Sequence, residues 1–201
     1  RYAVYEEADK PRGYVMYRAK SDWDEDGIPK GELRIVELQG LDPNAGDALW
    51  RYVFGVDLVD SISYWNLPVD DPVYWRLADP RRLRRRVQDS LWVRLLDIPA
   101  ALSGRRYAVP GRLVVDVRDE FVPSNSGTYV LESDGDTTRC ERKDLKPDIS
   151  LPVSDLGAVY LGGNSLCEVA AAGRAVADPA ALRLADAMFG WHPQPWCPEV
   201  F

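Results

Sequence analysis

Histidine, cysteine and methionine are scarce in this sequence. Its 201 residues include one histidine, His192, three cysteines and two methionines. The cysteines, Cys140, Cys167 and Cys197, lie far apart and form no Cys-x-x-Cys pair, so we predict no zinc site and no other bound metal. Cysteines without a disulfide framework are typical of a reducing compartment. We therefore predict a cytoplasmic protein with free thiols.

A long apolar run and an excess of positive charge are also missing. No apolar stretch approaches the roughly 20 residues that a transmembrane helix needs, so no membrane span is predicted. Lysine and arginine number 25 against 32 aspartates and glutamates, a formal net charge of −7. Nucleic acid binding depends mainly on basic surface. The charge balance therefore argues against a nucleic acid partner and suits a cationic substrate.

Apolar side chains are plentiful. They make up 46% of the residues, including seven tryptophans, which is enough for a sizeable core. The sequence opens at Arg1 and enters the apolar segment Tyr2-Ala3-Val4-Tyr5 at once, with nothing before it to supply a turn or a partner strand. This opening is typical of a cut chain, and we expect the function to belong to a longer polypeptide.

The first part of the sequence predicts three strands, a helix and a further strand. The first two strands flank the turn-forming residues 8–13, which indicates a hairpin. Asp42 and Pro43 then cap and start a helix through Gly55, because apolar residues recur at three-to-four spacing. A short helix begins at Pro72. The predicted strands cover residues 2–6, 13–19, 32–38 and 58–65.

The second part predicts strands first and helices last. That order indicates an antiparallel sheet with helices on one face, so the predicted fold class is α+β. The predicted strands cover residues 90–96, 112–117, 128–132, 137–142 and 148–153. The predicted helices cover residues 97–102, 156–161, 165–172 and 179–189, the second capped by Ser154-Asp155.

The last eleven residues, 191–201, do not look like a free end. Three prolines limit their freedom, and Trp191, Trp196 and Phe201 offer apolar surface that favours burial. A docked tail carries its terminal carboxylate with it, and a carboxylate in a partly apolar pocket can serve as a general base or a ligand. The alternative is a tail that is only packed. Glu199 can add negative charge for a cationic substrate, or it can be a solvated residue.

Several segments resemble one family in the right order. DLGAVYLGG at residues 155–163, AGR at 172–174 and ADAMF at 185–189 resemble the sterol-carrier-protein-like domain that closes the enhanced intracellular survival (Eis) type N-acetyltransferases. The upstream segments resemble the second, degenerate GNAT half of the same proteins. These segments are GYVMYR at 13–18, ALWR at 48–51, PVDDP at 68–72, LADPR at 77–81 and LWVRL at 91–95.

The resemblance implies two domains and an enzyme. Residues 1–96 would form a partial second GNAT-like domain with an antiparallel sheet, and residues 97–201 a sterol-carrier-protein-like domain with a functional tail. The implied reaction transfers the acetyl group of acetyl-CoA to an amine of an aminoglycoside or a lysine side chain. The carboxylate of Phe201 would be the general base, and Glu199 a substrate-binding residue. A homo-oligomer is implied, with a hexamer as the state to expect.

The resemblance also implies that part of the active site lies elsewhere. The first GNAT half, with its pyrophosphate-binding glycine loop and its acid tyrosine, is missing from this sequence. No Arg/Gln-x-x-Gly-x-Gly/Ala pattern opens a helix here. We therefore predict that the chain by itself binds no acetyl-CoA and is inactive. Two alternatives stay open: a lipid- or sterol-binding module, and a structural assembly module without a ligand.

Overall fold

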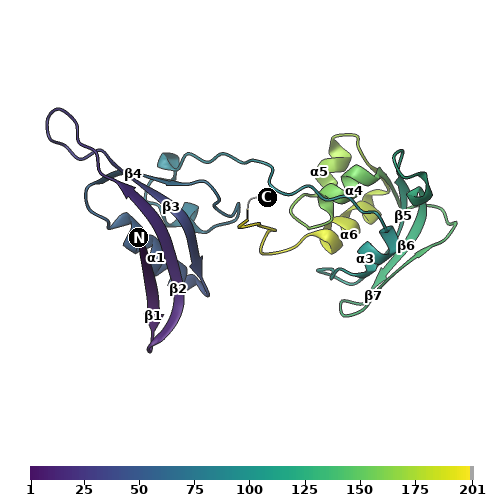
Figure 1. Ribbon diagram of the computed structural model, residues 1–201. Helices are drawn as coiled ribbons and strands as arrows, with labels where there is room; N and C mark the ends of the chain where they lie inside the picture. Colours follow the sequence, from purple (N-terminus) through teal and green to yellow (C-terminus); the bar gives the residue numbers. More distant parts are fainter. Residues whose placement is uncertain (200–201) are drawn as a thin grey trace. The chain divides into compact units, whose positions relative to one another are not determined.

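The computed structural model describes residues 1–199, which form two compact units (Figure 1). Residues 1–86 make up the body of the first unit and residues 87–197 the second. Each unit has its own sheet and its own buried core. The predicted α+β class is confirmed. The predicted division of the chain at residue 96 stays a prediction.

The first unit is built on a four-stranded sheet with the order β1-β2-β3-β4. β1 and β2 form the predicted hairpin around a tight turn at Ala8 and Asp9, whose φ angles are 49° and 59°. β3 pairs with β2 antiparallel, whereas β4 pairs with β3 parallel because a helix carries the chain back across the sheet. The strands are β1 (Tyr2–Glu7), β2 (Lys10–Lys20), β3 (Gly31–Gly40) and β4 (Val59–Tyr64).

The helix between β3 and β4 is α1 (Pro43–Phe54), and it begins as the sequence predicts. The Asp42 carboxylate accepts a hydrogen bond from Ala45 N–H at 2.9 Å, and Pro43 occupies the first turn. The apolar stripe of α1 covers one face of β1, β2 and β3. Two short helices follow β4: α2 (Val73–Arg76) and the 3₁₀ turn η1 (Pro80–Arg82).

The second unit has a five-stranded sheet with the order β7-β6-β5-β8-β9. β5, β6 and β7 form the predicted meander, and β8 lies on the other side of β5, parallel to it. The antiparallel pattern predicted from the sequence therefore holds for all neighbours but one in each sheet. The strands are β5 (Gly111–Arg118), β6 (Gly127–Ser133), β7 (Thr138–Arg142), β8 (Ile149–Pro152) and β9 (Val176–Ala177).

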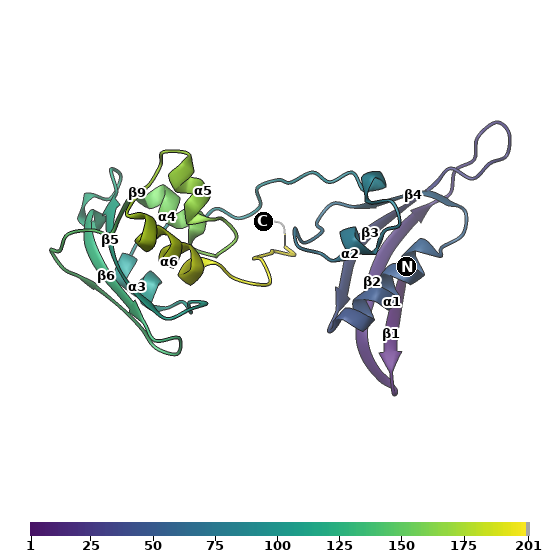
Figure 2. The ribbon, with the colours of Figure 1, turned by 180° about the vertical axis from the view of Figure 1, so that it is seen from behind.

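Helices cover one face of this second sheet (Figures 1 and 2). Their apolar sides and the facing strands enclose a core that includes Leu113, Leu131, Leu156 and Met188, each at most 1% exposed. The helices are α3 (Ile98–Ser103), α4 (Val153–Val159), α5 (Leu166–Ala171) and α6 (Pro179–Phe189), and a 3₁₀ turn η2 (Pro123–Asn125) precedes β6.

The strand predicted over residues 90–96 is wrong. This segment is described throughout but pairs with no strand, and of its apolar residues Trp92 is 84% exposed while Leu95 is buried. Its main chain crosses α4 instead: a side chain on Gly157 would collide with the carbonyl oxygen of Val93. The segment has the composition of a strand, but it packs against a helix rather than at a sheet edge.

The predicted cap of α4 is also wrong. The helix begins at Val153, one residue before the predicted Ser154-Asp155 cap, and no side chain caps it. The Asp155 carboxylate instead accepts a hydrogen bond from Arg174 Nε at 2.7 Å. Asp155 therefore ties α4 to the segment after α5.

Candidate functional site

The C-terminal tail, residues 190–199 as described, follows directly on α6. Gly190 ends this helix, and its N–H donates to Asp186 O at 3.0 Å. One residue later, Trp191 N–H donates to Gly162 O at 3.3 Å. The tail is therefore bonded, at its start, to the loop that follows α4.

The two residues to which the sequence assigns roles lie at the far end of this tail. Glu199 is described, and its side chain is exposed. Phe201, the predicted general base, lies outside the described residues, so its role stays a prediction. The residues that direct the start of the tail can be read from the structure.

Arg105 is the charged side chain beneath the start of the tail. It leaves the loop after α3, and its guanidinium donates to the carbonyl oxygens of Tyr160 and, at 2.9 Å, of Phe189. These carbonyls stand at the ends of α4 and α6, where the helix dipole is negative and cations are favoured. The guanidinium also lies 4.6 Å from the ring centre of Tyr107 and 4.8 Å from that of Phe189. Burial lowers the pKa of Arg105 from its usual value.

The first turn of α1 is a place to look for a pyrophosphate site, because the free amides and positive dipole end of a helix N-terminus can bind an anion. Here that position holds the Asp42 carboxylate, which accepts from Ala45 N–H and forms an ion pair with Arg12 at 2.6 Å. The hydrogen bond from Ala45 N–H, together with Arg12, lowers the pKa of Asp42. A fixed negative charge on these amides repels phosphate, so the residues at this end of α1 do not fit the pyrophosphate of acetyl-CoA.

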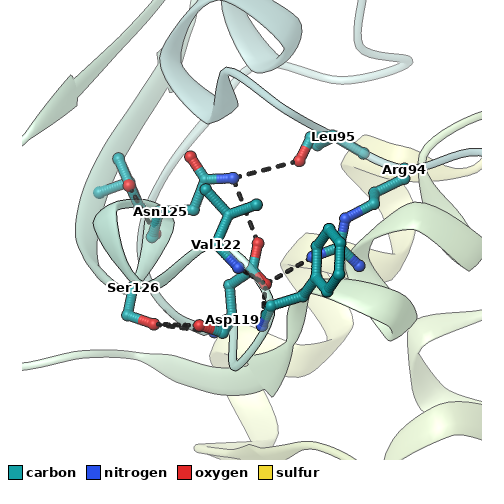
Figure 3. Close-up of polar contacts among 8 residues, drawn as sticks. Arg94, Leu95, Asp119, Val122, Asn125 and Ser126 are labelled. Atoms are coloured by element: carbon teal, nitrogen blue, oxygen red, sulfur yellow. Dashed lines mark hydrogen bonds and ion pairs between the residues drawn. The ribbon is translucent and has the colours of Figure 1, made fainter.

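A third polar cluster surrounds Asp119 in the second unit (Figure 3). The carboxylate accepts from Arg94 at 2.5 Å, from Val122 N–H at 2.9 Å, from Phe121 N–H at 3.0 Å and from the Asn125 amide at 3.2 Å. Burial alone would raise the pKa of Asp119, but these donors lower it. Because protein donors already occupy both oxygens, we interpret the cluster as an anchor for the loop between β5 and β6.

Sequence reasoning did not single out Arg105 or Asp119. Asp119 has no motif around it that differs from an ordinary loop aspartate. Arg105 follows Gly104 in a short loop, and only the three-dimensional structure shows that its side chain reaches two helix ends. Gly162 and Gly163 were noted as part of a family motif, without a physical role.

Two further observations concern the described residues, 1–199. They contain no cluster of histidine, cysteine, aspartate and glutamate side chains suited to hold a metal ion. None of their helices combines the length and the apolar character that crossing a membrane requires.

The first sheet carries an apolar hollow of about 480 Å³. Its lining includes Tyr2, Val4, Tyr14 and Met16 from β1 and β2. Tyr14 and Met16 alternate with Val15 and Tyr17, which are buried beneath α1, so the hollow lies on the other face of the sheet. The lining residues include no carboxylate, imidazole or thiol, and the titratable groups among them are the phenols of Tyr2 and Tyr14.

Together, the fold and the site define a two-domain α+β protein. The first domain has a small sheet with a crossover helix, and the second has a sheet covered by helices. The tail that follows the last of these helices is bonded to the loop after α4. The family model described as "Acetyltransferase (GNAT) domain" matches residues 1–95, and the one described as "Sterol carrier protein domain" matches residues 98–198. The chain therefore belongs to the family that these two models describe, a GNAT-type acetyltransferase domain followed by a sterol-carrier-type domain, and Eis-like N-acetyltransferases are among its homologues. The predicted resemblance to a GNAT domain followed by a sterol-carrier-type domain is therefore confirmed, while the status of the chain as the C-terminal portion of a longer protein stays a prediction.

Individual relatives agree with this assignment. A protein of Streptomyces avermitilis named as an N-acetyltransferase is 42% identical over 190 residues, which are 94% of this chain and 46% of that protein. N-acetyltransferase Eis of Mycobacterium tuberculosis is 33% identical over 181 residues, 89% of this chain and 42% of its own length. The chain spans about half the length of the curated relatives that it matches.

Solved structures show the same similarity. The crystal structure of an Eis protein from Mycobacterium abscessus has a TM-score of 0.79 at 34% sequence identity and covers 94% of this chain and 48% of its own. A GCN5-related N-acetyltransferase from Anabaena variabilis has a TM-score of 0.78 at 22% identity, covering 100% of this chain and 50% of its own. The second likeness concerns the fold alone.

Proposed function

We propose that this chain is part of an acetyl-CoA-dependent N-acetyltransferase and supplies the general base of its active site through the carboxylate of Phe201. The observation that carries the proposal is the tail itself. It leaves α6 along a defined course, with the Trp191 amide bonded to Gly162 O. The names of the relatives, N-acetyltransferases throughout, support the reaction class. The acceptor we propose is an amine of an aminoglycoside or of a lysine side chain.

The chemical role of the carboxylate is to accept a proton. An amine acceptor is protonated at neutral pH and must lose a proton before its nitrogen can attack a thioester carbonyl. A terminal carboxyl group has a reference pKa of roughly 3.3 to 3.7, so it stays ionised at neutral pH even when partial burial raises this value. It can therefore accept that proton directly or through a water molecule.

Acetyl-CoA itself we assign to another part of a longer polypeptide. The N-terminus of α1 holds a carboxylate where a phosphate would have to sit. We propose that the isolated chain binds no acetyl-CoA and has no turnover. Titration calorimetry of the chain with acetyl-CoA tests this point, and a saturable heat would contradict it.

The test of the base moves the carboxylate without changing the fold. In the longer polypeptide, one glycine added after Phe201 shifts the carboxylate by one residue, and we expect kcat to fall about 10²- to 10⁴-fold, the usual contribution of general acid–base catalysis. Phe201→Leu is the matched control, because it changes the side chain and keeps the carboxylate in place. Unchanged turnover after the glycine extension, with an unchanged circular dichroism spectrum, would disprove the proposal.

Glu199 has a smaller proposed role, as a negative charge that attracts the cationic acceptor. Its exposed side chain is compatible with such a role. Glu199→Gln should raise the acceptor KM by about twofold to fivefold and leave kcat unchanged, because an exposed charge screened by solvent contributes little to binding free energy. The increase should shrink at high salt.

The sterol carrier name of the second family model suggests lipid binding, but the structure does not favour it. The space between the second sheet and its helices is filled by buried side chains. Packing is so close that a Cβ on Gly111 would lie 2.5 Å from Met188 Sδ. We therefore expect a fluorescent fatty acid not to bind the chain, and stoichiometric uptake would revive this alternative.

We also propose that the enzyme works as a homo-oligomer in the cytoplasm, with a hexamer as the expected state. The oligomer is proposed from the family, and the cytoplasm from the three cysteines, which form no disulfide. Analytical ultracentrifugation of the longer polypeptide would measure the mass of the assembly.

A further inference from the structure

We propose that Gly162, Gly163 and Arg105 form a seat that fixes the course of the C-terminal tail between Trp191 and Pro195, and that these three are positioning residues for the group at the end of the tail. The last part of this inference depends on the proposed role of the Phe201 carboxylate. The first part, that the seat holds the tail, can be tested without any activity.

Gly162 allows the tail to approach as closely as it does. Its φ of +88° belongs to the left-handed region that favours glycine. A Cβ at this position would lie 2.6 Å from Phe189 O and 2.8 Å from Trp191 Cβ. The hydrogen bond from Trp191 N–H to Gly162 O requires this approach, so any other residue here would push the start of the tail away.

Gly163 makes the second contact, four residues further along the tail. A Cβ on Gly163 would lie 2.9 Å from Cγ and 3.1 Å from Cδ of Pro195. Proline has a rigid ring, so relief of this collision requires a shift of the tail backbone and not of one side chain. Consecutive glycines thus hold the tail at two points, Trp191 and Pro195.

Arg105 holds the two sides of this contact together. The loop with Gly162 and Gly163 follows α4, and the tail follows α6. The guanidinium donates to Tyr160 O at the end of α4 and to Phe189 O at the end of α6. One side chain therefore fixes the distance between the loop and the start of the tail.

Burial alone does not explain the course of the tail. Residues 191–195 are exposed, and Trp191 keeps 43% of its surface accessible. Little apolar area is removed from water over this stretch, so hydrogen bonds and close contacts, those to Gly162 and Gly163 among them, contribute to its order. Because close contacts hold the tail, one methyl group added at Gly162 or Gly163 should displace it.

The test measures the tail in the chain itself. Cys197 lies two residues beyond Pro195, the last contact of the seat, and Cys167 lies in α5, so alkylation by iodoacetamide, followed by peptide mass mapping, gives a tail rate and an internal reference. We expect Gly163→Ala and Arg105→Met to raise the alkylation rate of Cys197 about fivefold or more, as expected when a locally ordered segment opens. The rate of Cys167 should change less than twofold.

Two control variants separate the seat from general loosening. Arg106→Met removes the neighbouring arginine, which is exposed. Gly46→Ala adds the same methyl group in α1, where the nearest atom to the new Cβ outside the helix's own backbone, Arg76 Nη1, would lie 3.8 Å away. Both should leave the Cys197 rate unchanged. An unchanged alkylation rate of Cys197 in Gly163→Ala and Arg105→Met would disprove the proposal that the seat holds the tail.

A second arm tests the positioning role in the longer polypeptide. Misplacing a base by about 1 Å can cost up to a hundredfold in rate, so Gly163→Ala should lower kcat on the order of tenfold to a hundredfold with the acceptor KM unchanged. If kcat is unchanged although a glycine added after Phe201 abolishes turnover, the positioning role is wrong and the base stands. If neither Gly163→Ala nor the added glycine affects kcat while Gly163→Ala speeds the alkylation of Cys197, the seat holds the tail as proposed but the Phe201 carboxylate is not the general base.

Discussion

At the scale of single residues, the buried carboxylate of Asp119 holds the loop between β5 and β6 of the second unit in place. The carboxylate of Asp119 accepts four hydrogen bonds although its side chain is only 1% exposed. Three of the donors, Phe121, Val122 and Asn125, lie in the loop that the carboxylate anchors. Replacing the carboxylate by an amide would place an N–H₂ group against donors, which leaves the buried donors without acceptors.

The stability of the second unit should therefore depend on pH through Asp119. The folded-state pKa of Asp119 is lowered below its value in the unfolded chain, about 3.9. Its contribution to the free energy of unfolding is then fully present above that value and is lost as the pH falls through the folded-state pKa. Asp119→Asn should unfold at lower urea concentration than the wild type at pH 7, and the difference should shrink towards pH 3.

The matched control for this prediction is Asp136→Asn. Asp136 lies in the exposed turn between β6 and β7, where its side chain anchors no loop that the structure shows. Its variant should follow the wild type at every pH. A difference for Asp119→Asn that is the same at pH 7 and at pH 3 would show that the ionised carboxylate is not the stabilising group.

At the scale of helices and strands, local signals in the sequence were reliable at three helix starts and failed at the start of α4. Asp42 and Pro43 start α1 and Pro179 opens α6 as predicted, and the helix predicted from Ser165 begins one residue later, with Ser165 as its cap. In each case the deciding hydrogen bond or ring lies within three residues of the position that it controls. Such contacts can be read from the sequence because no distant partner is needed.

Sequence signals failed where the structure of a segment depends on a partner that is distant in the sequence. Residues 90–96 have the composition of a strand, but the surface available to them is helix α4 and not a sheet edge. β8 resembles an ordinary strand, but nothing local indicates that it runs parallel to β5. The seat of the tail was hidden for the same reason, since Arg105 and Phe189 are 84 residues apart.

The contact between β5 and α6 shows how closely two elements can meet through a glycine. Gly111 opens β5, and a Cβ there would lie 2.5 Å from Met188 Sδ and 3.1 Å from Leu184 Cδ1. Gly111→Ala should lower the free energy of unfolding by about 1 to 3 kcal/mol, the usual effect of overpacking. In a Met188→Ala background, which vacates the space, the same change should be nearly neutral.

Urea unfolding of the four proteins in this double-mutant cycle gives the coupling free energy. We expect about 1 kcal/mol or more, because the two residues are in contact. Gly46→Ala is the control for the added methyl group itself and should be neutral or slightly stabilising, since alanine favours a helix over glycine. Additive effects of Gly111→Ala and Met188→Ala would show that α6 shifts to make room.

At the scale of the whole molecule, the chain has two cores that share no residue. One is formed by α1 and the first sheet, with Leu49 2% exposed, and the other by the second sheet and its helices, with Leu131 fully buried. Units with separate cores are candidates for separate unfolding. Leu49→Ala and Leu131→Ala should each cost about 2 to 5 kcal/mol, because each leaves a cavity in its own core.

Hydrogen exchange in low urea, read by mass spectrometry of peptides, can assign each loss to a unit. We expect Leu49→Ala to speed exchange in peptides from residues 1–86 and leave those from 87–197 unchanged, and Leu131→Ala to do the reverse. Val36→Ala, at a residue that is 44% exposed on β3, controls for the loss of a side chain without a cavity. Faster exchange of both units in either core variant would show that the chain unfolds as one cooperative body, and the GNAT-type unit would then have to be studied together with the sterol-carrier-type unit that bears the tail.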